Sequence, residues 1–387
     1  MTRPTYPKAG TDTAKPMLEI HLIAGARPNF MKVAPLYHAL HASNWARPVL
    51  VHTGQHYDAA MSDAFFTDLK LPVPDHHLGI GSANHAQQTA RIMSGYDALC
   101  EAAAPDWTVV VGDVNSTIAC ALVAAKRGIP AAHLEAGLRS RDRSMPEEIN
   151  RLLTDQACDL LWPPSQDGVD NLLAENVPAH RIELVGNIMI DTLVMLQPAI
   201  AAAGVPERLG LDGYVLATFH RPANVDDPDR LATICEQLLA LAEIRPVVFP
   251  VHPRTRARLI ETGLLDRLTA QPSVHLVEPQ GYIAFMSLVH RAGLIVTDSG
   301  GVQEETSYLG IPCLTVRPNT ERPVTLELGT NRLIEPGLIA PSGATALTAR
   351  RAGAPEIPLW DGRTAGRVVG SLARAAGVSA PQISAAE

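Results

Sequence analysis

The sequence predicts an α/β protein with two Rossmann-like, doubly wound parallel-sheet domains that face a central cleft. Short apolar runs alternate with helix-length segments through most of the 387 residues, and this alternation is typical of parallel sheets with crossover helices. The runs are almost continuously apolar, as expected for strands covered on both faces. At roughly 150 residues per domain, the length favours two domains.

The predicted strands are the short apolar runs. In chain order they are Leu18–Ala24, Pro48–His52, Thr108–Val111, Ala131–Leu134, Ile182–Val185, Val215–Thr218, Val247–Pro250, His275–Val277, Leu294–Val296 and Cys313–Val316. Helix-length segments lie between them and include Met31–Ala42, Ser116–Arg127, Glu147–Ala157, Arg230–Ala242 and Val302–Leu309.

A shift in composition separates the two predicted domains. Ala, Gly and Pro dominate around residues 194–213, so we place the boundary there. The N-terminal domain is then 17–195 and the C-terminal domain 196–363. Residues 1–16 are expected to form a flexible extension, and 364–387 a final helix and tail.

Charge and hydropathy exclude several classes of protein. With 46% hydrophobic and 19% charged residues, the chain is unlike disordered proteins. Its formal net charge of -8 counts against a general nucleic-acid binder, whose binding surface is basic. The first 16 residues lack the apolar core of a signal peptide, and no apolar run approaches the roughly 18 residues of a membrane span. We therefore expect a soluble, cytoplasmic protein with no membrane partner.

The 5 cysteines are widely spaced and form no CxxC pair. No HExxH motif occurs either, so the sequence indicates neither a zinc site nor a disulfide framework. We expect buried, reduced thiols.

Most of the predicted strands end at a polar or glycine residue. The ends carry Arg27, residues 53–56, Asp113, Glu135, His220, His252, Glu278 and residues 298–301. In open parallel sheets the ligand crevice lies beyond the carboxyl ends of the strands. Such endings in both halves therefore predict one shared cleft rich in acids, histidines and arginines.

The segment "TDSGGVQEE" (297–305) follows a strand and opens a helix. Gly300 and Gly301 would let a ligand approach the unpaired amides of the helix N-terminus, which suits phosphate. The alternative is an ordinary helix start with Ser299 as its N-cap. No GxxxxGK[ST] motif occurs, and the nearest approach to GxGxxG (79–84) lacks its third glycine. No dinucleotide cofactor is expected.

Several of these side chains also have purely structural interpretations. Lys32 is either a phosphate clamp or an exposed first-turn lysine. Ser144 and Glu147 have the spacing of a capping box, which favours a structural role for Glu147. Asp113 and Glu135 are harder to explain without a function, because buried acids need a partner. His220 and His252 could each be a histidine bonded to the backbone.

A set of motifs resembles the non-hydrolysing UDP-N-acetylglucosamine 2-epimerases. In chain order they are "GARPNFMKVAPL" (25–36), "TGQHYDAAMSDAFF" (53–66), "GDVNST" (112–117), "HLEAGLRS" (133–140), "MPEEINRLLTD" (145–155), "FHRPANVD" (219–226), "PVHPRTR" (250–256), "TDSGGVQEE" (297–305) and "NTERPVT" (319–325). The resemblance implies a glycosyltransferase-B-like fold, a homodimer, a C-terminal domain that binds UDP, and a final helix at 364–376 that crosses back to the N-terminal domain.

The implied reaction inverts carbon 2 of UDP-N-acetylglucosamine by elimination and re-addition of UDP, without cofactor or metal. The resemblance also assigns site residues. The acid–base carboxylates would be Asp113, Glu135 and Glu147, and His220 would steady the departing phosphate. The residues that bind the UDP-sugar would be Arg27, Lys32, Phe285, Ser299, Gly300, Gly301 and Glu305. Gln55 and His252 correspond to a possible allosteric site, although Asp58 stands where a second glutamine is expected. The resemblance favours the catalytic role of Glu147 over the capping role, and one side chain could serve both.

Three alternatives stay open from the sequence. Relatives that epimerise UDP-diacetamido-uronic acids share most of these motifs. A hydrolysing relative would release free N-acetylmannosamine and UDP. A non-catalytic nucleotide-sugar-binding module is the alternative from a different class, and the intact carboxylates and His220 count against it.

Overall fold

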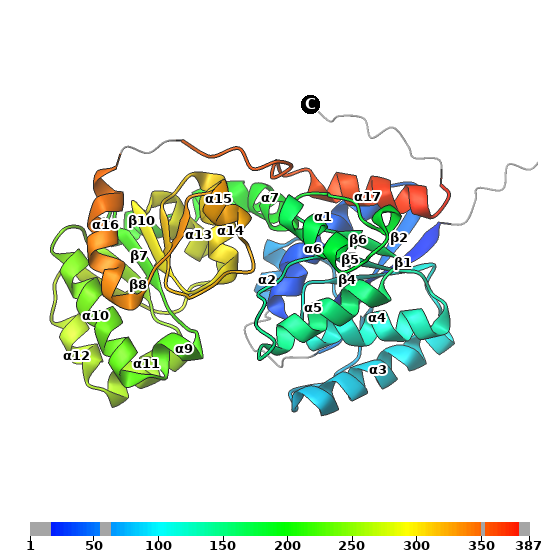
Figure 1. Ribbon diagram of the computed structural model, residues 1–387, viewed down its shortest axis with the longest axis horizontal. Coiled ribbons are helices and arrows are strands. Elements are labelled where there is room, and N and C mark those ends of the chain that lie inside the picture. The colour runs from blue at the N-terminus through cyan, green and yellow to red at the C-terminus, as the bar shows by residue number, and fades with distance from the viewer. Residues whose placement is uncertain (1–16, 55–62, 350–352, 379–387) are drawn as a thin grey trace, which may run out of the picture.

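The computed structural model describes residues 17–54, 63–349 and 353–378, which form two lobes (Figure 1). Within these residues each lobe contains one six-stranded sheet, and all strand pairs in both sheets are parallel. The strand orders are β3-β2-β1-β4-β5-β6 in the N-terminal lobe and β12-β11-β10-β7-β8-β9 in the C-terminal lobe. The predicted pair of doubly wound parallel sheets is confirmed.

The N-terminal lobe alternates strands and helices. Its strands are β1 (Leu18–Ala24), β2 (Ala46–His52), β3 (His76–His77), β4 (Trp107–Val111), β5 (Ala131–Leu134) and β6 (Leu160–Trp162). Its helices are α1 (Arg27–His41), α2 (Asp63–Asp68), α3 (His85–Ala102), α4 (Asn115–Arg127), α5 (Pro146–Ala157), α6 (Gln166–Ala174) and the 3₁₀ turn η1 (Ala179–Arg181).

After α7 (Ile188–Ala202) and α8 (Val205–Leu209) the C-terminal lobe begins. Its strands are β7 (Val215–Thr218), β8 (Val247–Pro250), β9 (Val274–Val277), β10 (Leu294–Thr297), β11 (Cys313–Thr315) and β12 (Asn331–Leu333). Its helices are α9 (Pro222–Val225), α10 (Pro228–Ala242), α11 (Pro253–Glu261), α12 (Leu264–Thr269), α13 (Tyr282–Arg291), α14 (Gly300–Leu309), α15 (Val324–Glu327), η2 (Pro336–Leu338) and α16 (Ile339–Thr348); the last helix is α17 (Thr364–Ala375).

Successive residues of each central strand face opposite layers of helices. In β1, Leu22 and Ala24 belong to a core cluster with α1, whereas Ile23 belongs to a cluster with α3 and α4. In β7, Leu216 shares the first cluster, and Val215 packs in a third with α10. Because both faces are covered, the strands are apolar at nearly every position.

Side chains fix the starts of helices next to the cleft. Asn29 accepts from the backbone N–H of Gly25 and Ala26 (3.1 and 2.9 Å) and donates to the Val111 carbonyl (3.0 Å). This side chain therefore holds the β1–α1 turn against the end of β4. Asp227 caps α10 by accepting from the N–H groups of Asp229 and Arg230, as expected for aspartate at this position.

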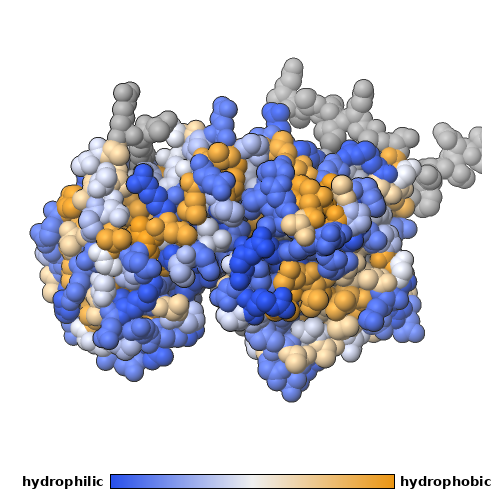
Figure 2. All heavy atoms as spheres, viewed as in Figure 1, coloured by the Kyte–Doolittle hydropathy of each residue, from blue (hydrophilic) through white to orange (hydrophobic). Residues whose placement is uncertain are grey.

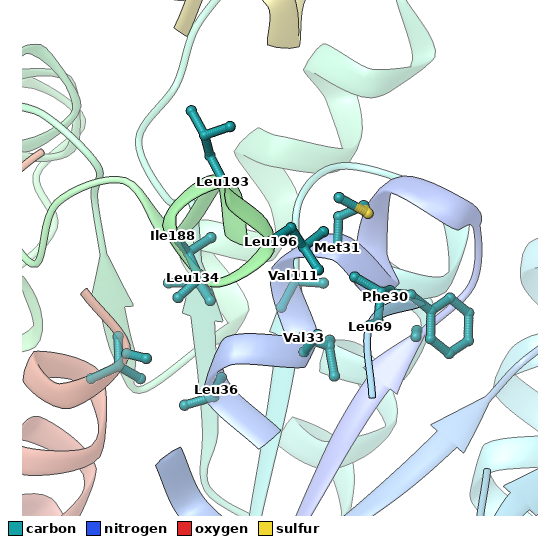
Figure 3. Packing of buried hydrophobic residues seen from close by; sticks show 14 of the residues in the cluster. Phe30, Met31, Val33, Leu36, Leu69, Val111, Leu134, Ile188, Leu193 and Leu196 are labelled. Carbon is teal, nitrogen blue, oxygen red and sulfur yellow. The ribbon is translucent and has the colours of Figure 1, made fainter. Parts of the chain in front are cut away.

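Helix α7 joins the two lobes. It contacts α1 on one side and α13 and α14 on the other, and Figure 3 shows Leu196 beside Met31 and Ile188 beside Leu134. The stretch Ile188–Leu209 has a mean hydropathy of 1.7, long and apolar enough to cross a membrane. The sequence expectation that no run reaches this length is therefore wrong, but the contacts are those of a core helix in a folded protein.

Helix α17 packs on the N-terminal lobe, where it contacts α1 and α7 (Figure 1). Its first turn is capped by Asp191 of α7, which accepts from the N–H groups of Thr364 and Ala365 (3.0 and 2.7 Å). Trp162 Nε1 donates to Ser371 Oγ (2.9 Å). The predicted boundary between residues 195 and 196 lies inside α7, so the domain limits stay a prediction.

A few elements differ from the sequence predictions. The short strands β3, β6 and β12 were not predicted, because runs of two or three residues give no periodicity. Residues 182–185 form no strand, although Ile182 makes an isolated bridge to Leu161. The five cysteines are free and buried, as expected.

Candidate active site

A cavity of about 890 Å³ lies between the lobes. Figure 2 shows a notch between them with hydrophilic residues along its walls. Both lobes contribute charged groups to the lining, including Lys32, Asp113, Glu147, Arg151, His220, Arg221, Arg317, Glu321 and Arg322. The predicted cleft is therefore present, and it is lined by residues at the carboxyl ends of both sheets.

Asp113 follows β4 and is held from α5. Its carboxylate pairs with Arg151, and its backbone carbonyl accepts from Asn150 Nδ2 (2.8 Å). Burial alone would raise the pKa of Asp113, but the charges of Arg151, Lys32 and Arg322 outweigh it and hold this pKa below the ordinary value. Asp113 is therefore an ionised carboxylate, able to accept a proton.

The preceding residue, Gly112, has a φ of +69°. A Cβ atom here would lie 3.1 Å from Lys32 Nζ and 3.4 Å from Glu135 Oε2. The backbone conformation and the close approach both favour glycine, so the turn brings Asp113 next to the other charged groups.

Glu135 follows β5 with a φ of +76°, an uncommon conformation for a residue with a side chain. Only 8% of its surface is exposed. Lys32 Nζ donates to Glu135 Oε2, and Arg322 Nη2 lies 3.3 Å from Oε1. Lys32 is buried, so the alternative of an exposed first-turn lysine is wrong. Strained backbone of this kind clusters at functional sites.

Arg322 is a buried cation among three acids. Its Nη2 contacts Glu135 of the N-terminal lobe, its Nε lies 3.0 Å from Glu304 Oε1, and its Nη1 lies 3.5 Å from Glu321 Oε2. Burial raises the pKa of Glu304, and the charge of Arg322 opposes this rise. Arg322 thus joins the two walls of the cleft by one guanidinium.

Glu147 lines the cavity from the first turn of α5. The capping-box interpretation is wrong, because Met145 is the N-cap residue and no side chain caps the helix. The neighbouring Glu148 has the structural role instead. It is buried and accepts from Ser140 N (2.8 Å), Ser140 Oγ (3.0 Å) and Arg141 N (3.0 Å).

His220 follows β7 and lines the cavity from the opposite lobe. Its Nδ1 lies 3.0 Å from Asp298 Oδ1, and Asp298 also accepts from the backbone N–H groups of His220 and Arg221. Burial alone would raise the pKa of Asp298, but its hydrogen bond with His220 and the charge of that histidine hold it low. His252 caps α11 by accepting from Arg254 N (3.2 Å), with its ring 5.9 Å from that of His220.

The N-terminus of α14 meets the cavity at Gly300 and Gly301. Ser299 occupies the N-cap position, but its side chain makes no capping bond. A Cβ atom at Gly300 would lie 2.9 Å from Arg322 Nη1, whereas one at Gly301 would meet nothing within 4 Å. This end of the helix therefore offers backbone amides beside a guanidinium, an arrangement that suits phosphate.

Two residues that the resemblance assigns to UDP-sugar binding lie outside the cavity lining. Glu305 is buried on α14, and burial raises its pKa to about 8. Phe285 is part of the core on α13. Neither is among the residues that line the cavity. Arg27 is the first residue of α1, and Gln55 lies outside the described residues.

The sequence interpretation assigned no role to Arg151, Glu304 or Arg322. Arg322 lies inside the quoted motif "NTERPVT", and Arg151 follows Glu147 by one helical turn, so the signals were present. Their ion pairs join segments far apart in the chain, and only the fold shows them. Among the described residues no three His, Cys, Asp or Glu side chains converge on a metal site.

Comparison with known proteins identifies the family. A family model for UDP-N-acetylglucosamine 2-epimerase matches residues 38–373. The chain is 42% identical over 326 residues to the UDP-N-acetylglucosamine 2-epimerase of Methanocaldococcus jannaschii, covering 82% of this chain and 88% of that protein. It is also 42% identical over 321 residues to the UDP-2,3-diacetamido-2,3-dideoxy-D-glucuronate 2-epimerase of Pseudomonas aeruginosa, with the same coverage.

Solved structures agree with this comparison. The structure of the Methanocaldococcus jannaschii UDP-GlcNAc 2-epimerase in complex with UDP-GlcNAc and UDP superposes with a TM-score of 0.83 at 39% identity, covering 92% of this chain and 100% of that chain. The Neisseria meningitidis UDP-GlcNAc 2-epimerase bound to UDP-GlcNAc gives 0.82 at 29% identity, covering 92% and 100%. With carboxylates on one wall of the cleft and the start of α14 on the other, and with these matches over most of its length, the chain belongs to the UDP-N-acetylglucosamine 2-epimerase family.

Proposed function

We propose that this enzyme interconverts UDP-N-acetylglucosamine and UDP-N-acetylmannosamine by eliminating and re-adding UDP. The observation that carries the proposal is the placement of Asp113 and Glu147 on one wall of the cleft and of the α14 N-terminus on the other. Arg322 lies between Gly300 and Glu135, which is buried and is not itself among the lining residues. The relatives whose names state this activity support it.

The diphosphate of the substrate would lie at Gly300 and Gly301. Backbone amides and the positive end of the α14 dipole favour its negative charge. Arg322 is already beside Gly300. On the opposite wall, Arg27 is the first residue of α1 and Lys32 of the same helix lines the cavity. His220, oriented by Asp298, would steady the phosphate oxygen as it leaves. Together these groups would stabilise the charge that develops on UDP.

The sugar would then lie toward the carboxylates. One carboxylate removes the proton from carbon 2, the electron pair forms the bond between carbons 1 and 2, and the bond from carbon 1 to the UDP oxygen breaks. A proton is then added to carbon 2 from the opposite face, and the same UDP oxygen attacks carbon 1. Two faces need two proton carriers. Asp113 and Glu147 line the cavity, and Glu135 pairs with two lining residues, Lys32 and Arg322.

A related UDP-diacetamido-uronic acid is the second candidate substrate. The identity to the glucuronate 2-epimerase is equal, at 42%. Arg221 lines the cavity, and among the described residues no carboxylate lies within ion-pair distance of its guanidinium. Burial and the nearby charge of Arg317 lower its pKa, a setting in which a further anionic group, such as a sugar carboxylate, would be favourable.

Proton NMR of each UDP-sugar in heavy water, with purified enzyme and no added nicotinamide or metal, tests the proposal. We expect deuterium at carbon 2 and a growing UDP-N-acetylmannosamine signal. Free N-acetylmannosamine with UDP would instead indicate a hydrolysing enzyme. Exchange of the uronic acid alone would select the second candidate, and exchange of neither sugar by protein that binds UDP would overturn the proposal.

Location and assembly are also proposals. Five free, buried cysteines fit a reducing compartment, so we place the enzyme in the cytoplasm. The family resemblance supports a homodimer, which sedimentation would test directly.

A further inference from the structure

A fully buried histidine contacts the turn that carries Asp113. His133 lies on β5 with 0% of its surface exposed, and it is not among the residues lining the cavity. Its Nε2 is 2.8 Å from the Gly112 carbonyl oxygen, and its Nδ1 is 2.6 Å from Asp155 Oδ1. The ring therefore links the end of β4 to α5.

Both partners of this ring are acceptors. A carbonyl oxygen cannot donate, so Nε2 carries a proton. Asp155 Oδ2 accepts from Arg139 Nη2 (2.7 Å) and from the Gly137 N–H (3.1 Å), and both bonds favour the ionised carboxylate. An ionised Asp155 can only accept from Nδ1. With a proton on each nitrogen, His133 is an imidazolium.

The surrounding charges balance this cation. Arg139 also pairs with Glu175 (2.7 Å), so two cations face two carboxylates. Beyond these four groups, Arg181 donates to the Asp155 backbone carbonyl (3.1 Å). The charges of Asp155, Asp159 and Arg181 all act on the Cys158 thiol, whose pKa burial raises. Burial alone would raise the pKa of Asp155, but His133 and Arg139 hold it below the ordinary value. Buried charges persist when they are paired in this way.

Helix α5 holds the Gly112–Asp113 turn at three points. Asn150 donates to the Asp113 carbonyl, Arg151 pairs with the Asp113 carboxylate, and Asp155 holds the ring that donates to the Gly112 carbonyl. We propose that His133, with a proton on both ring nitrogens, is a positioning residue that fixes the Gly112–Asp113 turn for proton transfer. The proposal rests on the proposed epimerase function, because it assigns Asp113 to that reaction.

Two substitutions separate the two bonds of the ring. In His133→Gln the amide nitrogen can take the place of Nε2 and keep the bond to Gly112, whereas in His133→Asn it can take the place of Nδ1 and keep only the bond to Asp155. We expect His133→Asn to lower kcat for carbon 2 exchange roughly 10- to 100-fold, as expected for a misplaced catalytic group, with KM within about threefold. His133→Gln should retain more of the rate.

His21 provides a matched control. It is equally buried in the same sheet and contacts Tyr96 and Glu19 instead of a cleft residue. We expect His21→Gln to leave kcat within about threefold of the unchanged enzyme, because a general loss of packing acts on stability more than on positioning. Unchanged kcat in His133→Asn, or equal loss in all three variants, would overturn the positioning role.

The protonation of the His133 ring can be measured independently of enzyme activity. In protein carrying ¹⁵N-histidine, His133 should show two protonated ring nitrogens at pH 7.5, assigned by the signal that is lost in His133→Gln, or in His133→Asn where the first does not fold. A neutral ring overturns the assignment. If the unchanged enzyme exchanges neither UDP-sugar, the proposed function fails, and the NMR signal still decides the charge of His133.

Discussion

Arg322 Nη2 in the C-terminal lobe lies 3.3 Å from Glu135 Oε1 in the N-terminal lobe. This contact places one cation between a candidate proton carrier and the helix end that would bind phosphate. The guanidinium is therefore close to both groups. Because three carboxylates surround Arg322, replacing it should affect the stability of the protein as well as its activity.

Replacing Arg322 by Gln should lower kcat/KM for carbon 2 exchange by about 100-fold or more, since a cation at the leaving phosphate is lost. It should also lower the free energy of unfolding by about 3–5 kcal/mol, because Glu304 stays buried without its cationic partner and Glu135 keeps only Lys32. Urea unfolding measures the second effect. Arg254→Gln, which breaks the exposed pair with Asp226, should change stability by less than about 1 kcal/mol; equal losses would contradict the prediction.

Glu147 and Glu148 are adjacent in sequence, but their substitutions should affect different properties of the enzyme: the first its rate and the second its stability. Glu147→Gln should lower the exchange rate by roughly 10²–10⁴-fold with stability unchanged, because the side chain faces the cavity. Glu148→Gln should lower stability by about 1–3 kcal/mol, because it weakens the bonds to Ser140 and Arg141. Thermal unfolding and exchange kinetics on both variants test this, and a stability loss in Glu147→Gln would restore its capping role.

Gly301→Ala should weaken UDP binding by about tenfold or more while the protein stays folded. The added methyl group meets no protein atom within 4 Å, and alanine in a helix is more stable than glycine by about 0.5–1 kcal/mol. A weaker complex would therefore report contact with the ligand. Calorimetric titration of UDP measures it, with Gly337→Ala, which also meets no atom within 4 Å, as the control. Unchanged affinity would place the diphosphate elsewhere.

Glu305 should make the folded protein less stable as the pH rises from 6.5 to 8. Burial raises its pKa to about 8 from the ordinary value of 4.5. In this pH window the folded chain keeps a proton that the unfolded chain has released, so the free energy of unfolding falls by about 1.6 kcal/mol in total. Glu305→Gln removes the titrating group, and urea unfolding at several pH values should show a flatter dependence. If the free energy of unfolding depended on pH in the same way in both proteins, Glu305 would be ionised over the whole pH range.

Much of the fold could be predicted because its signals are local. The strands β1 and β7 have the predicted limits, since buried parallel strands are continuous apolar runs. Residues 160–162 were missed because three apolar residues at a sheet edge resemble a loop. The predicted strand at 182–185 has the right composition, but only Ile182 reaches a neighbour.

The site was predictable only in part, for a similar reason. Asp113 and Glu135 stand at strand ends, a position that the linear pattern reveals. The cation between Glu135 and the proposed phosphate site is Arg322, which is 187 residues from Glu135, so its role depends on how the lobes are placed. The capping assignment for Glu147 relied on helical spacing, whereas the loop before α5 folds back onto Glu148.

The cluster that contains α7 continues without interruption from one lobe to the other. It includes Leu36 on α1 and Leu196 on α7 (Figure 3), and Met286 on α13. Separating the lobes would expose this shared apolar surface to water, which is unfavourable. The molecule should accordingly melt as one cooperative unit, with equal calorimetric and van't Hoff enthalpies, and an N-terminal lobe produced without its partner should be prone to aggregate.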